Sequence, residues 1–167
     1  MDAKQFILSV LVNNEAGVLT RVSGLFARRS FNIDSLSVAE TQDPQLSRIT
    51  ISATGDDYLR QQIVKQLEKL HDVRMVQVMD PERTVVRELM LIKIRASHEQ
   101  RSRIQEAVSV FRAKVVDLSQ DSMIVELTGE KNKVDAFFEL LGAYEVTELC
   151  RTGMTAIGRN NYTLIPQ

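Results

Sequence analysis

Residues 9–38 read SVLVNNEAGVLTRVSGLFARRSFNIDSLSV, and this stretch decides the fold of the first half of the chain. An apolar strand leads into a polar turn at residues 13–17 and from there directly into an amphipathic helix, and a second strand follows Asn32. Such a turn brings the free N–H groups of a helix N-terminus to the edge of a sheet. The stretch therefore predicts a site for a small carboxylate rather than a site that breaks bonds.

The periodicity around this stretch predicts the element order βαββαβ for residues 1–80. In the third strand, residues 48–53 (RITISA) alternate between polar and apolar side chains. This alternation predicts that the polar face of the sheet, with Thr50 and Ser52, is exposed to water. The apolar stripe of the first helix is expected to contain Leu19, Val22 and Phe26. The expected elements are strands at residues 6–12, 33–40, 48–53 and 73–79 and helices at about residues 17–29 and 56–70.

The same pattern repeats after residues 80–84 (DPERT), which are typical of a linker. The simplest account is an α+β fold of two tandem ferredoxin-like βαββαβ domains, at residues 1–80 and 81–167. Residues 151–167 are expected to form a partly irregular tail of the second domain. The strands of this half are expected near residues 89–95, 114–118, 122–128 and 146–151, with helices around Val108 and Phe137.

The two halves differ at the start of their first helices. Residues 97–100 (SHEQ) fit a capping box, in which Ser97 and Gln100 satisfy the N–H donors of the helix. In the first half the helix begins near Gly17, and the capping candidate close by is Asn14. An uncapped start beside a glycine favours ligand binding in the first domain, whereas the alternative is that Asn14 caps the helix. Spacing alone leaves both interpretations open.

The composition favours a protein of the cytoplasm and argues against two classes of partner. Residues 1–80 carry 9 basic and 10 acidic side chains, and residues 81–167 carry 12 of each. Neither half has the basic excess typical of proteins that bind nucleic acid or an anionic membrane. The longest apolar run, residues 89–92, is too short to span a bilayer. Cys150 is the single cysteine, and we expect a buried structural thiol in a reducing compartment.

The sequence offers no set of residues for catalysis. His71 and His98 fall in different predicted domains without metal-ligand spacing, and no glycine-rich phosphate-binding motif is present. Arg28 and Arg29 are typical of the last turn of a helix, where they complement its dipole. We therefore predict no catalytic residue, metal or cofactor in this chain, and we interpret it as a sensor of a small amino acid.

Six segments of the chain carry a family resemblance. They are residues 14–22 (NEAGVLTRV), 32–38 (NIDSLSV), 43–51 (DPQLSRITI), 87–89 (REL), 111–114 (FRAK) and 151–153 (RTG). The first half resembles an ACT domain, an amino-acid-sensing module built on a βαββαβ unit. The whole chain resembles the small, regulatory subunit of acetolactate synthase (acetohydroxyacid synthase). The family usually has glycine where this chain has Ser30, and residues 141–145 (LGAYE) also depart from the family pattern.

The resemblance implies a regulatory function. Such subunits form homodimers through their ACT domains and bind a separate catalytic subunit, which carries thiamine diphosphate, Mg²⁺ and FAD. The holoenzyme condenses two pyruvates, or pyruvate with 2-oxobutyrate, in branched-chain amino-acid synthesis. The small subunit activates the catalytic subunit and confers feedback inhibition, mostly by valine. The implied effector site consists of Asn14, Gly17, Val18 and Leu19 of one chain, with Asn32 and Ile33 of its partner.

Each residue of this site has an expected contact. The N–H groups of the first helix turn would hold the effector carboxylate. The amides of Asn14 and Asn32 would contact its ammonium and carboxylate groups, and Ile33 would accept the isopropyl group. Two alternatives are open. One is that the two asparagines are ordinary turn residues. The other is that the chain is a free-standing tandem ACT sensor that acts on a transcriptional or other protein partner.

Overall fold

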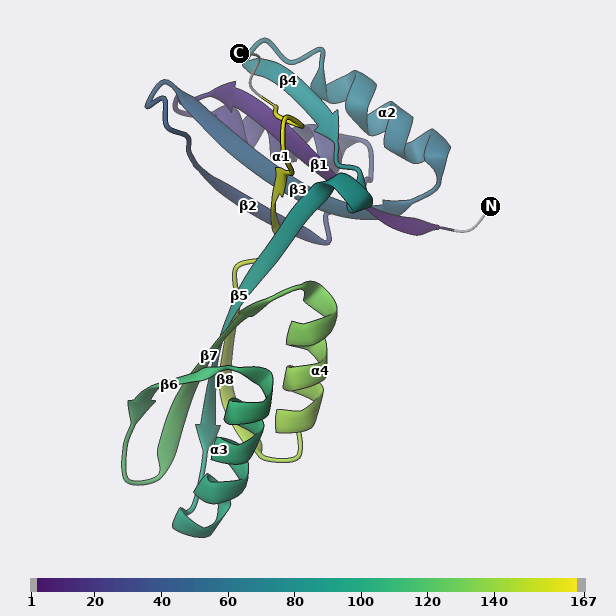
Figure 1. Ribbon diagram of the computed structural model, residues 1–167. Coiled ribbons are helices and arrows are strands. Elements are labelled where there is room, and N and C mark those ends of the chain that lie inside the picture. The colour runs from purple at the N-terminus through teal and green to yellow at the C-terminus, as the bar shows by residue number, and fades with distance from the viewer. Residues whose placement is uncertain (1–2, 165–167) are drawn as a thin grey trace. The chain divides into compact units, whose positions relative to one another are not determined.

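The structure, a computed structural model, describes residues 3–164, and the chain forms two compact units (Figure 1). Residues up to Val85 and residues from Met154 onward form the first unit, and Val86–Gly153 form the second. The boundary between the units falls after Val85 rather than after residue 80. The expected tail of the second domain also differs, because the chain after Gly153 returns to the first unit. Residues 165–167 of the expected tail lie outside the described residues.

The first unit has the order βαββαβ, as its periodicity predicts. Its sheet has the strand order β2-β3-β1-β4, and every neighbouring pair is antiparallel. Because β1 and β2 both pair with β3, they run parallel to each other, and β2 and β4 are the edge strands. The elements are β1 (Lys4–Asn13), α1 (Val18–Arg28), β2 (Ser35–Glu40), β3 (Leu46–Gly55), α2 (Asp57–Leu67) and β4 (Val73–Val78).

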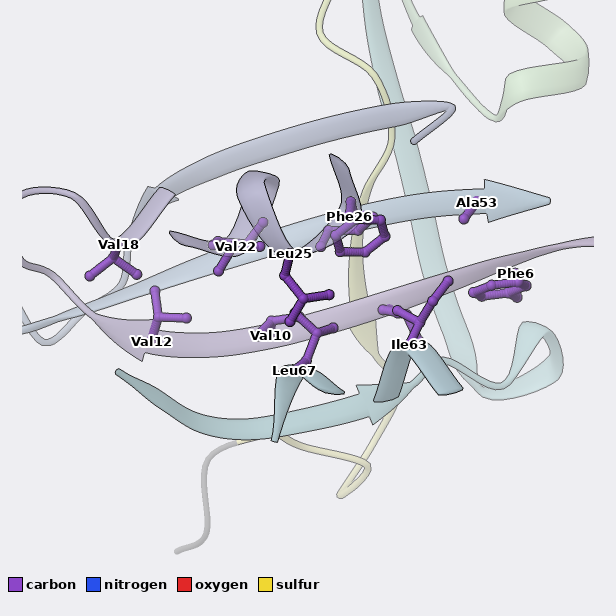
Figure 2. Packing of buried hydrophobic residues seen from close by; sticks show 13 residues of the cluster. Phe6, Val10, Val12, Val18, Val22, Leu25, Phe26, Ala53, Ile63 and Leu67 are labelled. Carbon is purple, nitrogen blue, oxygen red and sulfur yellow. The ribbon is translucent and has the colours of Figure 1, made fainter. Parts of the chain in front are cut away.

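An apolar core fills the space between this sheet and its helices (Figure 2). Val10 on β1, Phe26 on α1 and Ile63 on α2 are 0%, 1% and 0% exposed, and each such burial contributes roughly 1.5–3 kcal/mol. Leu19, predicted to lie in the apolar stripe of the first helix, is instead 42% exposed, and the first turn of α1 buries Val18.

α1 ends in a Schellman motif built around Ser30. The Ser30 N–H donates to Ala27 O at 3.2 Å, and the Phe31 N–H donates to Phe26 O at 3.0 Å. The rings of Phe26 and Phe31 meet edge to face, with centroids 6.3 Å apart. Ser30 itself has φ +55°, the left-handed conformation that glycine adopts most easily.

The prediction that the polar face of this sheet is exposed to water is wrong. Thr50 and Ser52 are only 2% and 1% exposed. The C-terminal segment, defined here as residues 154–164, lies on this face and contains β9 (Thr155–Gly158). Its residues Met154 and Ala156 are 5% and 3% exposed. The alternation in β3 separates the two faces correctly, but it carries no information on a segment far along the chain that covers one of them.

The second unit repeats the architecture, which confirms the predicted fold class. Its sheet has the order β6-β7-β5-β8, and β9 also pairs with β5. A short 3₁₀ turn, η1 (Pro81–Arg83), replaces most of the expected linker. No helix within residues 3–164 is long and apolar enough to cross a membrane. The elements are β5 (Thr84–Arg95), α3 (His98–Phe111), β6 (Lys114–Leu118), β7 (Ser122–Gly129), α4 (Lys131–Leu141) and β8 (Glu145–Arg151).

Two side-chain predictions for this unit have opposite outcomes. The capping box is confirmed, because the Gln100 N–H donates to Ser97 Oγ and the Ser97 N–H donates to Gln100 Oε1 at 3.0 Å. The buried thiol is wrong, because Cys150 is exposed. Cys150 lies on the edge strand β8, where it pairs with Leu91 of β5, and the helices cover the opposite face of the sheet, which holds Met90 and Ile92.

Candidate functional site

The start of α1 presents unsatisfied backbone donors. Gly17 is its N-cap residue, and no side chain in the described part of the chain caps this start. The N–H groups of Gly17 and Leu19 have no acceptor within residues 3–164, and the Val18 N–H reaches Glu15 O only at 3.4 Å. Together with the positive end of the helix dipole, these donors form a site that can bind a carboxylate.

The backbone at Gly17 favours glycine, and the Arg21 side chain lies close to it. Its φ of +85° is disfavoured for any residue with a Cβ atom. A Cβ at this position would lie 3.0 Å from Nη1 of Arg21. The Arg21 guanidinium therefore lies against the backbone of the helix start and adds positive charge to it.

Asp72 holds Arg21 in this position. Arg21 Nε donates to Asp72 Oδ2 at 2.6 Å, and the Asp72 side chain is only 8% exposed. This hydrogen bond is the main cause that lowers the pKa of the Asp72 carboxyl below its ordinary value. The Asp72 carbonyl accepts the Asn13 N–H at 2.9 Å, so the pair fixes α1 against the end of β1. The Nη groups of Arg21 have no acceptor among the described residues.

Asn14 lies beside the helix start but does not cap it. Its Nδ2 donates to Pro44 O at 2.9 Å and to Glu40 Oε2 at 3.3 Å, so both amide hydrogens are used. Its Oδ1 accepts the Ser47 hydroxyl at 3.0 Å and keeps one lone pair. Asn14 is thus held against the β2–β3 hairpin and presents an oxygen that suits an ammonium group.

Asn32 and Ile33 lie at the opposite end of β2 from Asn14. They precede Ser35 at the start of β2, whereas Asn14 contacts Glu40 at its end. The six residues of β2 span about 17 Å. The structure therefore does not bring the two halves of the expected site together within one chain.

The contacts of Asn32 and Ile33 within the chain leave part of each side chain free to contact a ligand. Asn32 Nδ2 donates to Asp34 Oδ1 at 3.2 Å, and the Asp34 carboxylate also accepts the Thr54 hydroxyl at 2.7 Å. The Asn32 side chain is exposed, and its Oδ1 has no partner within residues 3–164. Ile33 is half-buried against the core of the first unit, so only part of its side chain can meet a ligand.

Two residues of this site were not predicted from the sequence, namely Arg21 and Asp72. The signal for Arg21 was present, because it follows Gly17 by one helical turn and a cation in the first turn of a helix is disfavoured by the dipole. Asp72 lies far along the chain, and nothing in its local sequence identifies it as the partner of Arg21. Within residues 3–164 no group of three or more His, Cys, Asp or Glu side chains could hold a metal ion.

Comparison with known families assigns both halves of the chain. The ACT domain of acetolactate synthase small subunits and related proteins matches residues 8–75, which contain the whole candidate site. The family described as the small subunit of acetolactate synthase matches residues 87–160. The probable acetolactate synthase small subunit of Methanothermobacter thermautotrophicus is 46% identical, over 98% of both chains. The chain belongs to the acetolactate synthase small-subunit family.

Further members of the acetolactate synthase small-subunit family agree. The probable small subunit of Archaeoglobus fulgidus is 48% identical, over 92% of this chain and 96% of its own. The crystal structure of the small subunit from Thermotoga maritima matches with a TM-score of 0.89 at 44% identity, over 95% of this chain and 99% of that chain. The resemblance stated from sequence motifs is thereby confirmed over nearly the full length of the chain.

Proposed function

We propose that this chain activates an acetolactate synthase catalytic subunit in the cytoplasm and makes it sensitive to feedback inhibition by valine. The observation that carries the proposal is the uncapped start of α1, with the free N–H groups of Gly17 and Leu19 beside the Arg21 guanidinium. In this proposal the chain itself holds no cofactor, and the catalytic partner supplies thiamine diphosphate, Mg²⁺ and FAD.

The chemistry of valine fits the groups at this end of the sheet. Its carboxylate would accept the free N–H groups of α1, with the Arg21 guanidinium beside it. Its ammonium group would donate to Asn14 Oδ1, which has a lone pair to spare. Its isopropyl group needs apolar contact, which the exposed Leu19 provides from one chain and Ile33 from the other.

The sheet topology supports a homodimer that completes this site. β2 is an edge strand with unpaired backbone groups, which a second copy would cover. In a symmetric side-by-side pair, β2 would run antiparallel to β2 of the second copy. The start of the partner strand, with Asn32 and Ile33, would then lie beside the end of the first strand, next to Asn14. The 43% exposed side chain of Val38 on β2 would also be covered.

The proposal is tested by reconstitution with the catalytic subunit from the same organism. We expect co-purification of the two subunits, higher acetolactate formation with the small subunit than without it, and loss of that activation on addition of valine. Failure to bind the catalytic subunit would contradict the proposal and favour a free-standing ACT sensor.

Binding of the effector is tested on this chain alone. L-Valine at a hundredfold excess over its dissociation constant should stabilise the protein by about 2.7 kcal/mol per site, which is read as a rise in melting temperature. Alanine should bind less tightly by about 1–3 kcal/mol, because it lacks the methyl groups that the apolar side chains contact. D-Valine is the stereochemical control and should shift the melting temperature much less than L-valine.

A further inference from the structure

The C-terminal segment contacts the edge strand that carries the second half of the candidate site. The Ser37 hydroxyl on β2 donates to Met154 O at 3.1 Å, and the Met154 N–H donates to Ser35 Oγ at 3.4 Å. On β3, Arg48 Nη1 donates to Ala156 O at 3.3 Å. Burial at this contact lowers the pKa of the Arg48 guanidinium. The segment is thus held on β2 and β3 through side chains, and its backbone pairing is limited to the four-residue β9, which pairs with β5.

The sheet face beneath this segment is lined by hydroxyl groups. The register places Ser9, Thr50 and Ser52 on this face together with Ser35 and Ser37, and it places the apolar Ile7 and the buried Leu11 there as well. Ser9 is fully buried, and its Oγ has no hydrogen-bond partner among the described residues. The helix-covered face, by contrast, holds the main apolar core of this unit. Water can satisfy these hydroxyl groups when they are exposed, so the cost of uncovering this face comes mainly from its few apolar contacts, such as Leu11 and Met154.

The C-terminal part of this segment is attached by separate contacts, to β4 and to η1. The Tyr162 hydroxyl donates to Val78 O at 3.0 Å, and the Arg83 guanidinium lies 4.4 Å from the centroid of its ring. The Arg159 N–H donates to Arg83 O at 2.7 Å. A Cβ at Gly158 would lie 1.8 Å from Tyr162 O, so this turn accepts only glycine.

We propose that the C-terminal segment is a releasable strap, which opens from the first unit without global unfolding and closes when valine binds. The valine part rests on the proposed function. Asn32 and Ile33 immediately precede β2, so a ligand that orders them also orders the strand on which Ser35 and Ser37 hold the segment.

Hydrogen exchange on the full chain, with and without valine, tests the strap. Without valine, the amides of Met154 and Arg159 should exchange about a hundredfold faster than the amides of β1 and β3 in the core. Saturating valine should slow the exchange of the strap amides by about tenfold. Strap amides that exchange only as fast as the core amides would overturn the release.

Two variants sharpen this test. Gly158→Ala should increase exchange of the strap amides by about tenfold and leave β1 and β3 unchanged, because the added Cβ meets the Tyr162 backbone. The control is Gly24→Ala, whose Cβ would meet only the guanidinium end of Arg28 at 3.3 Å. Ser37→Ala, with Ser23→Ala as its control, tests the other end without a steric clash. A Ser37→Ala chain with unchanged strap exchange would contradict the anchoring by β2.

The outcomes separate this inference from the proposed function. If valine slows exchange at residues 14–19 and 32–33 but not in the strap, valine binding stands and the valine-driven closure is overturned. If valine changes exchange nowhere, the proposed effector is wrong, and the closure falls with it. The release of the strap is judged in both cases from the exchange measured without valine.

Discussion

At the scale of single residues, Ser30 carries the clearest backbone strain in the first unit. Its φ of +55° closes the Schellman motif at the end of α1. A side chain in this conformation costs about 1 kcal/mol relative to glycine. The Phe26–Phe31 contact and the two backbone hydrogen bonds nevertheless hold the turn in place.

Ser30→Gly should therefore raise the free energy of unfolding by about 1 kcal/mol. Urea unfolding followed by circular dichroism measures the change. Ser23→Gly is the matched control, because Ser23 lies inside α1, where glycine should lower the free energy of unfolding by about 0.5 kcal/mol. Equal effects of the two substitutions would contradict the strain at Ser30.

Asn14 shows how far a single residue can be predicted from its sequence. The sequence located it correctly beside the helix start, but it left open whether Asn14 caps the helix. The partners that decide this, Glu40, Pro44 and Ser47, lie on a hairpin about thirty residues away. Local propensity describes the nearest backbone donors and contains no information on such distant partners.

At the scale of elements, an ion-pair cluster joins β5, α4 and β8 in the second unit. Arg151 donates to both oxygens of Glu88, at 2.7 and 2.8 Å, and to Asp135 Oδ1 at 2.8 Å. Glu88 is 5% exposed, and Arg151 supplies hydrogen bonds to both oxygens of this buried carboxyl group. Lys131, which also pairs with Asp135, is the main cause that lowers the pKa of the Asp135 carboxyl, with Arg151 contributing.

This cluster predicts a loss of stability in acid. Because the pKa of Asp135 is lower in the folded than in the unfolded chain, the unfolded chain takes up the proton first as the pH falls. The stabilisation is therefore fully present above the unfolded value of about 3.9 and is lost as the pH falls through the folded pKa. Urea midpoints of Asp135→Asn should depend less on pH between about 2 and 5 than those of the natural chain.

Glu139→Gln on the same helix is the control for this prediction. Glu139 is exposed and lies outside the ion-pair cluster. Its substitution should leave the pH dependence of the urea midpoint unchanged. If Asp135→Asn and Glu139→Gln showed the same pH dependence as the natural chain, the cluster would not contribute to stability in acid.

The elements also show where sequence patterns stop being informative. Periodicity and capping residues predicted the helices and strands of both units, because each element carries its own apolar face. The same patterns missed the C-terminal segment, whose residues have no helical or strand period and cover a polar face. They also missed the exposure of Cys150, because the local sequence does not show which face of the edge strand β8 the helices cover.

At the scale of the whole molecule, the proposed effector site requires a second copy of the chain. Within one chain, Asn14 and Asn32 lie at opposite ends of β2. A symmetric pair through β2 would bring each Asn14 beside Asn32 of the partner subunit. Light scattering at micromolar concentration should therefore return the mass of a dimer without ligand, and the mass of a monomer would contradict the pairing.

Single substitutions at the two asparagines should weaken valine alone. Asn14→Ala and Asn32→Ala should each raise the dissociation constant of valine by about ten- to a hundredfold, because each removes a hydrogen bond to a charged group. Activation of the catalytic subunit should remain, since it does not require bound effector. Ser97→Ala in the capping box is the control and should cost about 1 kcal/mol of stability without changing valine binding.

The most direct test of a site shared between chains is a heterodimer of these two variants. Chains with Asn14→Ala and Asn32→Ala would be co-expressed with different tags and purified as a mixed dimer, and valine binding would be measured by calorimetry. A site shared between chains leaves one fully intact site per mixed dimer, so we expect the natural dissociation constant and about half the natural number of sites. A mixed dimer that binds valine as weakly as either parent variant would contradict a shared site.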